Sequence, residues 1–159
     1  ADVKKLLLAR GVAESESEVL ARISEGSVGT ALNLNEQNAL EYRQTALSFI
    51  EALPLEFPMN YVTDRTWVVK YERAEAMLFV KLLQLLLRDM LFIKTGVTVN
   101  LYNCDVQGNL TALSGGWQQK KKKKALAATN DAYKALASSV GVKLVMENLA
   151  MKIDNFRKE

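Results

Sequence analysis

The sequence contains no histidine, and Cys104 is its only cysteine. Without histidine, the chain cannot form a Ser-His-Asp or Cys-His catalytic centre, nor a zinc site built from cysteine and histidine. A single cysteine excludes an internal disulfide and is typical of a protein in the reducing cytoplasm. We therefore expect Cys104 to be a small apolar side chain, and we predict no catalytic, metal or cofactor site.

Proline and glycine are also scarce, with two and eight residues in a chain of 159. Helix-favouring residues dominate, above all Ala, Leu, Lys, Glu and Met, and 49% of the residues are hydrophobic. A chain of this length can bury one sizeable core, or one core and a small appended unit. The composition therefore predicts an all-α protein.

Long uncharged hydrophobic runs are missing as well. The most apolar stretch spans residues 77–93, and the charges of Lys81, Arg88 and Asp89 within it argue against a membrane helix. The net charge of +3, from 21 basic and 18 acidic residues, does not by itself indicate a nucleic-acid-binding protein. The chain begins at Ala1 without a signal-peptide pattern, and we interpret it as part of a longer cytoplasmic protein that has no membrane partner.

The first 35 residues predict three short helices. Gly11 suits the left-handed end of the first helix, and Ser15 with Glu18 forms a capping-box pattern at the start of the second. Ser27 can cap the third. Each of these helices has one narrow apolar face, so we predict a small helical unit rather than a complete core.

The residues that follow predict a larger bundle. Apolar residues recur at helical spacing over residues 36–53 and 72–94, and Pro54 and Gly96 end these two helices. The second is apolar on nearly every side and about 35 Å long, so other helices must surround it. We predict a loop with one helix for residues 54–71.

The last third of the chain continues the helical pattern. Asp105 could cap a helix that runs through Leu113, before glycines break it. An alanine-rich helix follows, and Gly141 separates it from a final helix that reaches Phe156. A turn this short predicts that the last two helices pack antiparallel.

Three segments of this pattern resemble one protein family. They are LARISEGSVGTALNL (residues 20–34), ERAEAMLFVKLLQLLLRDMLFIKTG (residues 72–96) and LVMENLAMKI (residues 144–153), the last preceded by Asn130 in the penultimate helix. They are similar, in this order, to the end of the AAA+ lid subdomain, the central collar helix and the final two helices of bacterial DNA polymerase III clamp-loader delta-prime subunits.

The resemblance implies two parts, an AAA+ lid remnant of three short helices in residues 1–35 and a collar-type helical bundle in residues 36–159. It implies a non-catalytic oligomerisation domain, although the parent holoenzyme is a DNA-directed DNA polymerase. The collar would bind the delta and gamma/tau subunits and would reach DNA and the sliding clamp only through the complex. This complex places the sliding clamp on primed DNA during replication.

The turn Gly26, Ser27 and Gly29 departs from the pattern of ATP-hydrolysing relatives. These carry Gly-Ser-x-Arg-x-Ala-Leu, with an arginine that senses nucleotide, and Gly29 stands at the arginine's position. The resemblance therefore implies a degenerate nucleotide-sensor turn and a delta-prime subunit rather than a motor subunit. From the residues alone, the turn is either an anion-binding nest or a C-cap followed by an N-cap, and we favour the caps.

Candidate DNA contacts come from a run of five lysines, whose ammonium groups could displace counterions from phosphates. Five consecutive residues of a helix point all round it, so we predict a solvated loop or helix start, with weak salt-sensitive DNA contact as the alternative. A stand-alone nucleic-acid-binding module and an unrelated helical adaptor are the rival functions. The run consists of Lys120, Lys121, Lys122, Lys123 and Lys124.

We predict structural roles, rather than catalytic or ligand-binding roles, for the clustered carboxylates and for the aromatic residues. We predict that clustered glutamates are exposed helix charges rather than catalytic pairs, because no pattern indicates a pocket around them. We predict that the aromatic residues belong to the core, with some of them anchoring an interface. The residues concerned are Glu14, Glu16, Glu18, Glu72 and Glu75, and Trp67, Tyr71, Phe79 and Phe92.

Overall fold

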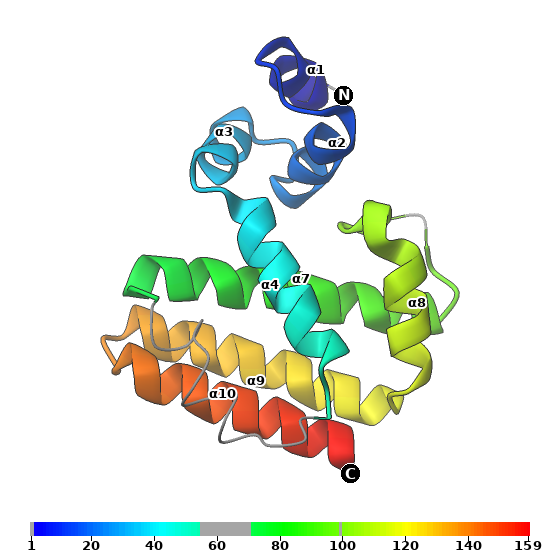
Figure 1. Cartoon of the computed structure of the whole chain (residues 1–159), viewed down its shortest axis with the longest axis vertical. Coiled ribbons are helices and arrows are strands. Elements are labelled where there is room, and N and C mark those ends of the chain that lie inside the picture. Colours follow the sequence, from blue (N-terminus) through cyan, green and yellow to red (C-terminus); the bar gives the residue numbers. More distant parts are fainter. Residues whose placement is uncertain (1, 55–70, 99) are drawn as a thin grey trace.

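The computed structural model describes residues 2–54, 71–98 and 100–159, and every regular element in these ranges is helical. The all-α prediction is confirmed. Three short helices lie at one end of the molecule, and α4 leads from them into a bundle of longer helices (Figure 1). The elements are α1 (Asp2–Ala9), α2 (Glu14–Ile23), α3 (Val28–Glu36), α4 (Ala39–Glu51), α7 (Arg73–Lys94), η1 (Cys104–Val106), α8 (Gln107–Gly115), α9 (Gln119–Ala137) and α10 (Val142–Lys158).

Helices α1 to α3 form a small unit with its own apolar cluster. Gly11 ends the first helix region with a φ of +84°, as predicted. The predicted capping box at Ser15 is wrong, because α2 begins at Glu14 and the N-cap position is Ala13, which makes no side-chain cap. Acidic residues in the first turn favour this start, since they complement the positive helix N-terminus. The buried cluster consists of Val3, Leu7, Leu20 and Ala31.

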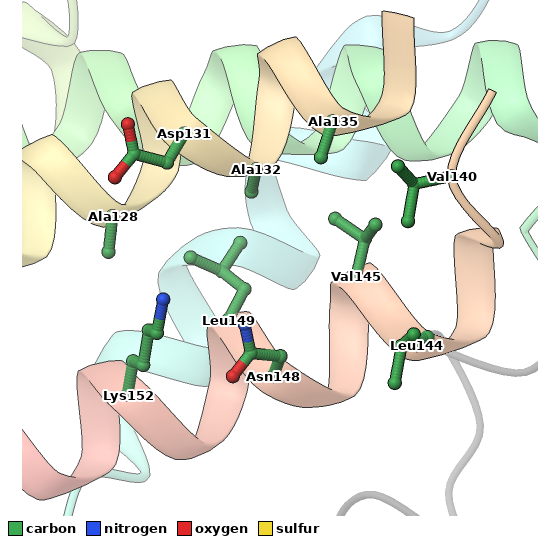
Figure 2. A pocket seen from close by; sticks show the side chains of 10 residues that line it. All are labelled: Ala128, Asp131, Ala132, Ala135, Val140, Leu144, Val145, Asn148, Leu149 and Lys152. Atoms are coloured by element: carbon green, nitrogen blue, oxygen red, sulfur yellow. The ribbon is translucent and has the colours of Figure 1, made fainter. Parts of the chain in front are cut away.

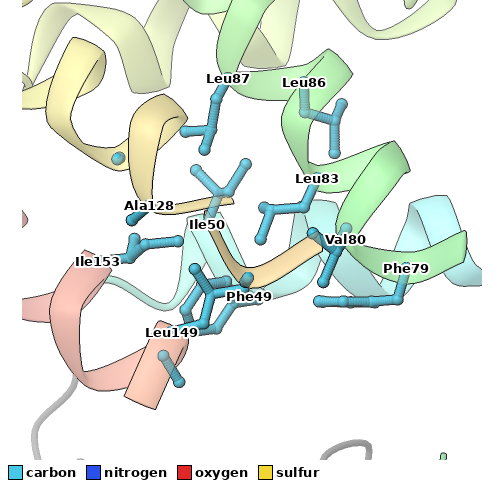
Figure 3. Close-up of a cluster of buried hydrophobic side chains, with 14 of the residues drawn as sticks. Phe49, Ile50, Phe79, Val80, Leu83, Leu86, Leu87, Ala128, Leu149 and Ile153 are labelled. Atoms are coloured by element: carbon cyan, nitrogen blue, oxygen red, sulfur yellow. The ribbon is translucent and has the colours of Figure 1, made fainter. Parts of the chain in front are cut away.

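Helix α7 is the centre of the bundle, and it packs against α4, α8 and α9. Its start is fixed by a capping box between Glu72 and Glu75, and it ends before Gly96, whose φ is +79°. In the described ranges, no helix is long and apolar enough to cross a membrane. Side chains from α4, α7, α9 and α10 meet in the main core (Figure 3), among them Phe49, Ile50, Phe79, Leu83, Ala128, Leu149 and Ile153.

A buried carboxylate on α7 anchors the segment that joins the bundle to the three-helix unit. We call residues 100–105 the joint segment. The Asp89 side chain is fully buried and accepts hydrogen bonds from the backbone N–H of Asn103 at 2.8 Å, from Asn103 Nδ2 at 2.9 Å and from the backbone N–H of Tyr102 at 3.3 Å. Asp89 therefore satisfies one buried and one partly buried backbone donor that would otherwise lack an acceptor.

The joint segment is held by helices on its other sides as well. Arg43 on α4 makes two hydrogen bonds to the Asp105 carboxylate, at 2.6 and 2.7 Å. Arg22 on α2 donates to the carbonyl of Leu101 at 3.0 Å. The prediction that Asp105 caps a helix is wrong, because this residue lies inside η1 and its carboxylate binds Arg43. The joint segment thus connects α2, α4 and α7.

Candidate protein-interaction groove

The described ranges contain an open groove between α9 and α10, with a volume of about 380 Å³. Figure 2 shows that side chains from both helices point into it. Its floor is apolar and nearly inaccessible, since Ala128, Ala132 and Val145 are each 7% exposed. Asp131 and Lys152 provide charged groups at its edge. A concave apolar surface with a few polar groups is the usual form of a binding site.

The groove exists because α9 presents small side chains to α10. Ala128, Ala132 and Ala135 follow one another at four- and three-residue spacing, so they share one face of the helix. Across from them, Val145 and Leu149 stand one turn apart on α10. Methyl groups cannot fill the space between two helices, so an open channel remains above the packed floor.

The rim of the groove exposes apolar groups to solvent. Leu144 is 66% exposed, more than any other large apolar side chain in the described ranges, and Val140 beside the groove is 39% exposed. Burying an apolar side chain of this size in a complex releases water from its surface and is favourable by about 1.5–3 kcal/mol. Exposed apolar groups around an apolar groove are typical of protein-interaction sites.

The Gly26 to Gly29 turn lies on the three-helix unit and is exposed. Gly26 has a φ of +84°, and Ser27 is the N-cap of α3, with its Oγ accepting a hydrogen bond from the backbone N–H of Thr30 at 3.2 Å. This confirms the predicted N-cap, whereas the C-cap of α2 is Ser24 and the left-handed backbone begins at Glu25, with a φ of +52°. A Cβ atom at Gly29 would meet no atom within 4 Å, so packing does not require glycine at this position. The assignment as a degenerate sensor stays a prediction.

The lysine run forms the first turns of α9, so the predicted helix start is confirmed. The prediction that all five lysines are in solvent is wrong. Lys122 is fully buried, and its ammonium donates to Ser114 Oγ at 2.7 Å. Burial, followed by the positive charge of Lys94, lowers the pKa of Lys122 to about 8. Lys121 forms an ion pair with Glu159. The three remaining lysines are exposed, namely Lys120, Lys123 and Lys124.

The predicted helix charges mostly carry structural contacts. Glu14 and Glu18 form ion pairs with Lys4, and the pKa of Glu18 is lowered by its hydrogen bonds to Arg22 and Lys4. Glu16 is exposed. In the part of the chain that the structure describes, no group of three or more Cys, Asp or Glu residues could hold a metal ion.

The predicted core aromatic residues have different environments. Phe79 is fully buried, and Tyr71 packs against the core beside it, with ring centroids 5.7 Å apart. Phe92 is partly exposed, and the guanidinium carbon of Arg88 lies 4.3 Å from the centroid of its ring. Trp67 lies outside the described residues. So do residues 55–70, which make up most of the stretch 54–71 for which we predicted a loop with one helix.

Two specific features of the structure, the groove and the hydrogen-bond network of Asp89, were not predicted from the sequence. The groove depends on the alanines of α9, which in the sequence predict only a helix. The Asp89 network had a visible signal, because an acidic residue inside the apolar stretch of residues 77–93 needs hydrogen-bond donors when it is buried. The donors to that carboxylate lie 13 and 14 residues further along the chain, so they could not be predicted from the local sequence.

No protein-family model matches the chain, and a search of curated proteins finds no relative. The likeness to delta-prime subunits therefore rests on the sequence segments themselves.

Proposed function

We propose that this chain is a non-catalytic assembly domain that binds sister subunits of a bacterial clamp loader through the groove between α9 and α10. The observation that carries the proposal is the exposed apolar rim of this groove, above all Leu144. Residues 1–35 would be the AAA+ lid remnant and residues 36–159 the collar of a delta-prime subunit. The parent complex would work in the cytoplasm.

Several features support assembly rather than chemistry. The groove offers apolar contact area and few polar groups, which suits a helix of a neighbouring subunit better than a reacting substrate. Gly29 cannot supply the guanidinium that ATP-hydrolysing relatives use. We therefore expect the purified chain to hydrolyse no ATP, which a phosphate-release assay measures. Steady ATP turnover would contradict the proposal.

The change Leu144→Asp should weaken assembly without harming the fold. Leu144 is 66% exposed and lies in the first turn of α10, where a carboxylate complements the positive helix N-terminus. A carboxylate in an apolar contact loses its hydration, so we expect the dissociation constant for the delta and gamma/tau subunits to rise at least about tenfold. Isothermal titration calorimetry with these subunits from the same organism measures the effect.

The matched control is Val97→Asp. Val97 is an exposed apolar residue just beyond the end of α7, outside the groove, and it is 48% exposed. This variant introduces the same charge and should assemble like the parent chain. Equal weakening by both variants would contradict the groove as the contact surface. Failure of the parent chain to bind these subunits, while it binds another protein, would favour the unrelated adaptor.

A further inference from the structure

One end of the bundle gathers basic residues from two distant parts of the sequence. We call residues 116–124 and 154–159 the basic end. Helices α9 and α10 run antiparallel, so the start of the first lies beside the end of the second (Figure 1). A cleft of about 180 Å³ lies between them, lined by Lys121, Phe156 and Arg157 among others. The fold therefore joins the lysine run to a second basic segment.

The basic end carries more positive charge than the whole chain does. Its two segments contain seven basic and two acidic residues, which gives a net charge of +5, whereas the complete chain has +3. All other residues together therefore have a net charge of −2. The net positive charge of this protein is therefore concentrated at the basic end, where it creates a local field that attracts anions.

Among the residues that the structure describes, most of these cations have no acidic partner. Lys121 pairs with Glu159, and Lys158 pairs with Asp154 at 2.7 Å. Within the described residues, the other four exposed or partly exposed cations form no ion pair. They are Lys120, Lys123, Lys124 and Arg157, of which Lys124 faces the ring of Phe156 at 5.7 Å and Arg157 faces the ring of Trp117 at 5.8 Å.

The position of the lysines on α9 opposes helix stability. A helix N-terminus carries a partial positive charge, so acidic residues stabilise the first turn and each cation there costs about 0.3–1 kcal/mol. The first turn of α9 contains no acidic residue and begins the run of five lysines. Charge placed against the requirements of the fold indicates a binding function.

We propose that the basic end binds the phosphate backbone of a nucleic acid without sequence preference. Lys120, Lys123, Lys124 and Arg157 contact phosphates, while the buried Lys122 does not. We expect no base stacking at this site, because Trp117 is only 5% exposed and the ring of Phe156 is faced by Lys124. An anionic membrane is a poorer ligand, since none of the exposed large apolar residues of the described ranges lies in the basic end to insert into lipid.

The test is binding of a fluorescently labelled DNA duplex of mixed sequence, measured by anisotropy across a salt series. Four phosphate contacts predict a slope of log K against log salt of about −3 to −4. The triple variant Lys120→Gln, Lys123→Gln, Lys124→Gln should reduce this slope to about −1 and lower affinity at about 50 mM salt at least tenfold. Glutamine keeps the helix propensity of lysine, so circular dichroism should be unchanged.

The control changes three exposed lysines outside the basic end, Lys5→Gln, Lys81→Gln and Lys134→Gln, and produces the same net charge. It should retain most of the affinity and the slope. Equal loss in both triple variants would overturn the proposal, because net charge alone would then explain binding. Two further results would also overturn it: no duplex binding at low salt, or a strong preference for one DNA sequence.

Vesicles with anionic lipid distinguish a membrane ligand. Binding to these vesicles without binding to the duplex would overturn the proposal. The experiment is independent of subunit assembly, since the basic-end triple variant leaves Leu144 and the groove unchanged and should bind the delta and gamma/tau subunits like the parent chain.

Discussion

Replacing Asp89 with alanine should destabilise the protein by about 3–5 kcal/mol, the cost of leaving buried partners of a charged group unpaired. The Asp89 side chain is fully buried, and the variant would leave the backbone N–H groups of Tyr102 and Asn103 without their acceptor. The N–H of Asn103 is itself buried, so water cannot replace the carboxylate without opening the structure. Urea unfolding followed by circular dichroism measures the change in the free energy of unfolding.

The same variant should loosen the joint segment. Hydrogen exchange of the Tyr102 and Asn103 amides should become faster than in the parent chain, because both lose a fixed acceptor. The contact between Arg22 and the carbonyl of Leu101 should weaken with them, since the carbonyl belongs to the same segment. The three-helix unit would then lose one of its attachments to the bundle.

Two control variants separate this role from the loss of any acidic residue. Asp131→Ala removes an exposed aspartate from the middle of α9 and should change stability by less than about 0.5 kcal/mol. Asp89→Asn keeps one oxygen acceptor, so its free energy of unfolding should lie between those of the parent chain and Asp89→Ala. If Asp89→Ala is no less stable than Asp131→Ala, the network does not have the role that we assign to it.

Replacing Lys122 with methionine should stabilise the protein near neutral pH. Lys122 is fully buried, its neutral partner is Ser114, and the charge of Lys94 adds repulsion. Methionine has a similar length and suits an apolar site. Ser114 would keep its hydrogen bond to the carbonyl of Met90 at 2.8 Å, so only the contact with the ammonium is lost. Removing the buried charge should increase the free energy of unfolding by about 1–3 kcal/mol.

This gain should depend on pH in a defined direction. The pKa of Lys122 is about 8 in the folded state and near its ordinary value of 10.5 in the unfolded state. Between these values the unfolded chain binds more protons, so the stability of the parent chain rises with pH through this window. Below about pH 8 the penalty of the buried charge is complete, and above about pH 10.5 it is absent, so the advantage of methionine should shrink across the window.

Urea unfolding of the parent chain and Lys122→Met at about pH 7 and about pH 10 measures the difference. Comparing the two proteins at each pH cancels the titration of tyrosines, which both contain. The charge assignment would be wrong if the methionine variant were less stable at pH 7, or if the difference between the two proteins were the same at both pH values. A mutation of exposed Lys134 to methionine is the control and should give no such pH dependence.

The helices and most of their ends followed from local sequence. Apolar residues at three- and four-residue spacing predicted α4, α7 and α10, and the glycines at positions 11 and 96 have the positive φ angles expected where helices end. The start of α2 was predicted incorrectly, because both Glu14 and Ser15 suit the beginning of a helix and the sequence does not rank them. These features depend on hydrogen bonds and side chains within a few residues, so a single sequence contains the information.

The basic end and the groove were harder to predict from the sequence than the helices. The run of five lysines was visible, but its pattern could not show that Lys122 turns inward while its neighbours remain in solvent. Nor could it show that Arg157 and Lys158 lie beside the run, because more than thirty residues separate them in the chain. The alanines of α9 likewise predicted a helix and gave no indication of a groove.

By itself, the sequence determined that this protein is helical, where most helices end, and that a long apolar helix must be enclosed by others. The tertiary structure alone decided which side of each helix meets a neighbour. It buried Lys122 beside Ser114, gave Asp89 its donors from the joint segment and brought the start of α9 to the end of α10. The physical reason is that helix formation depends on contacts within a turn or two, whereas burial and charge pairing depend on residues that only folding brings together.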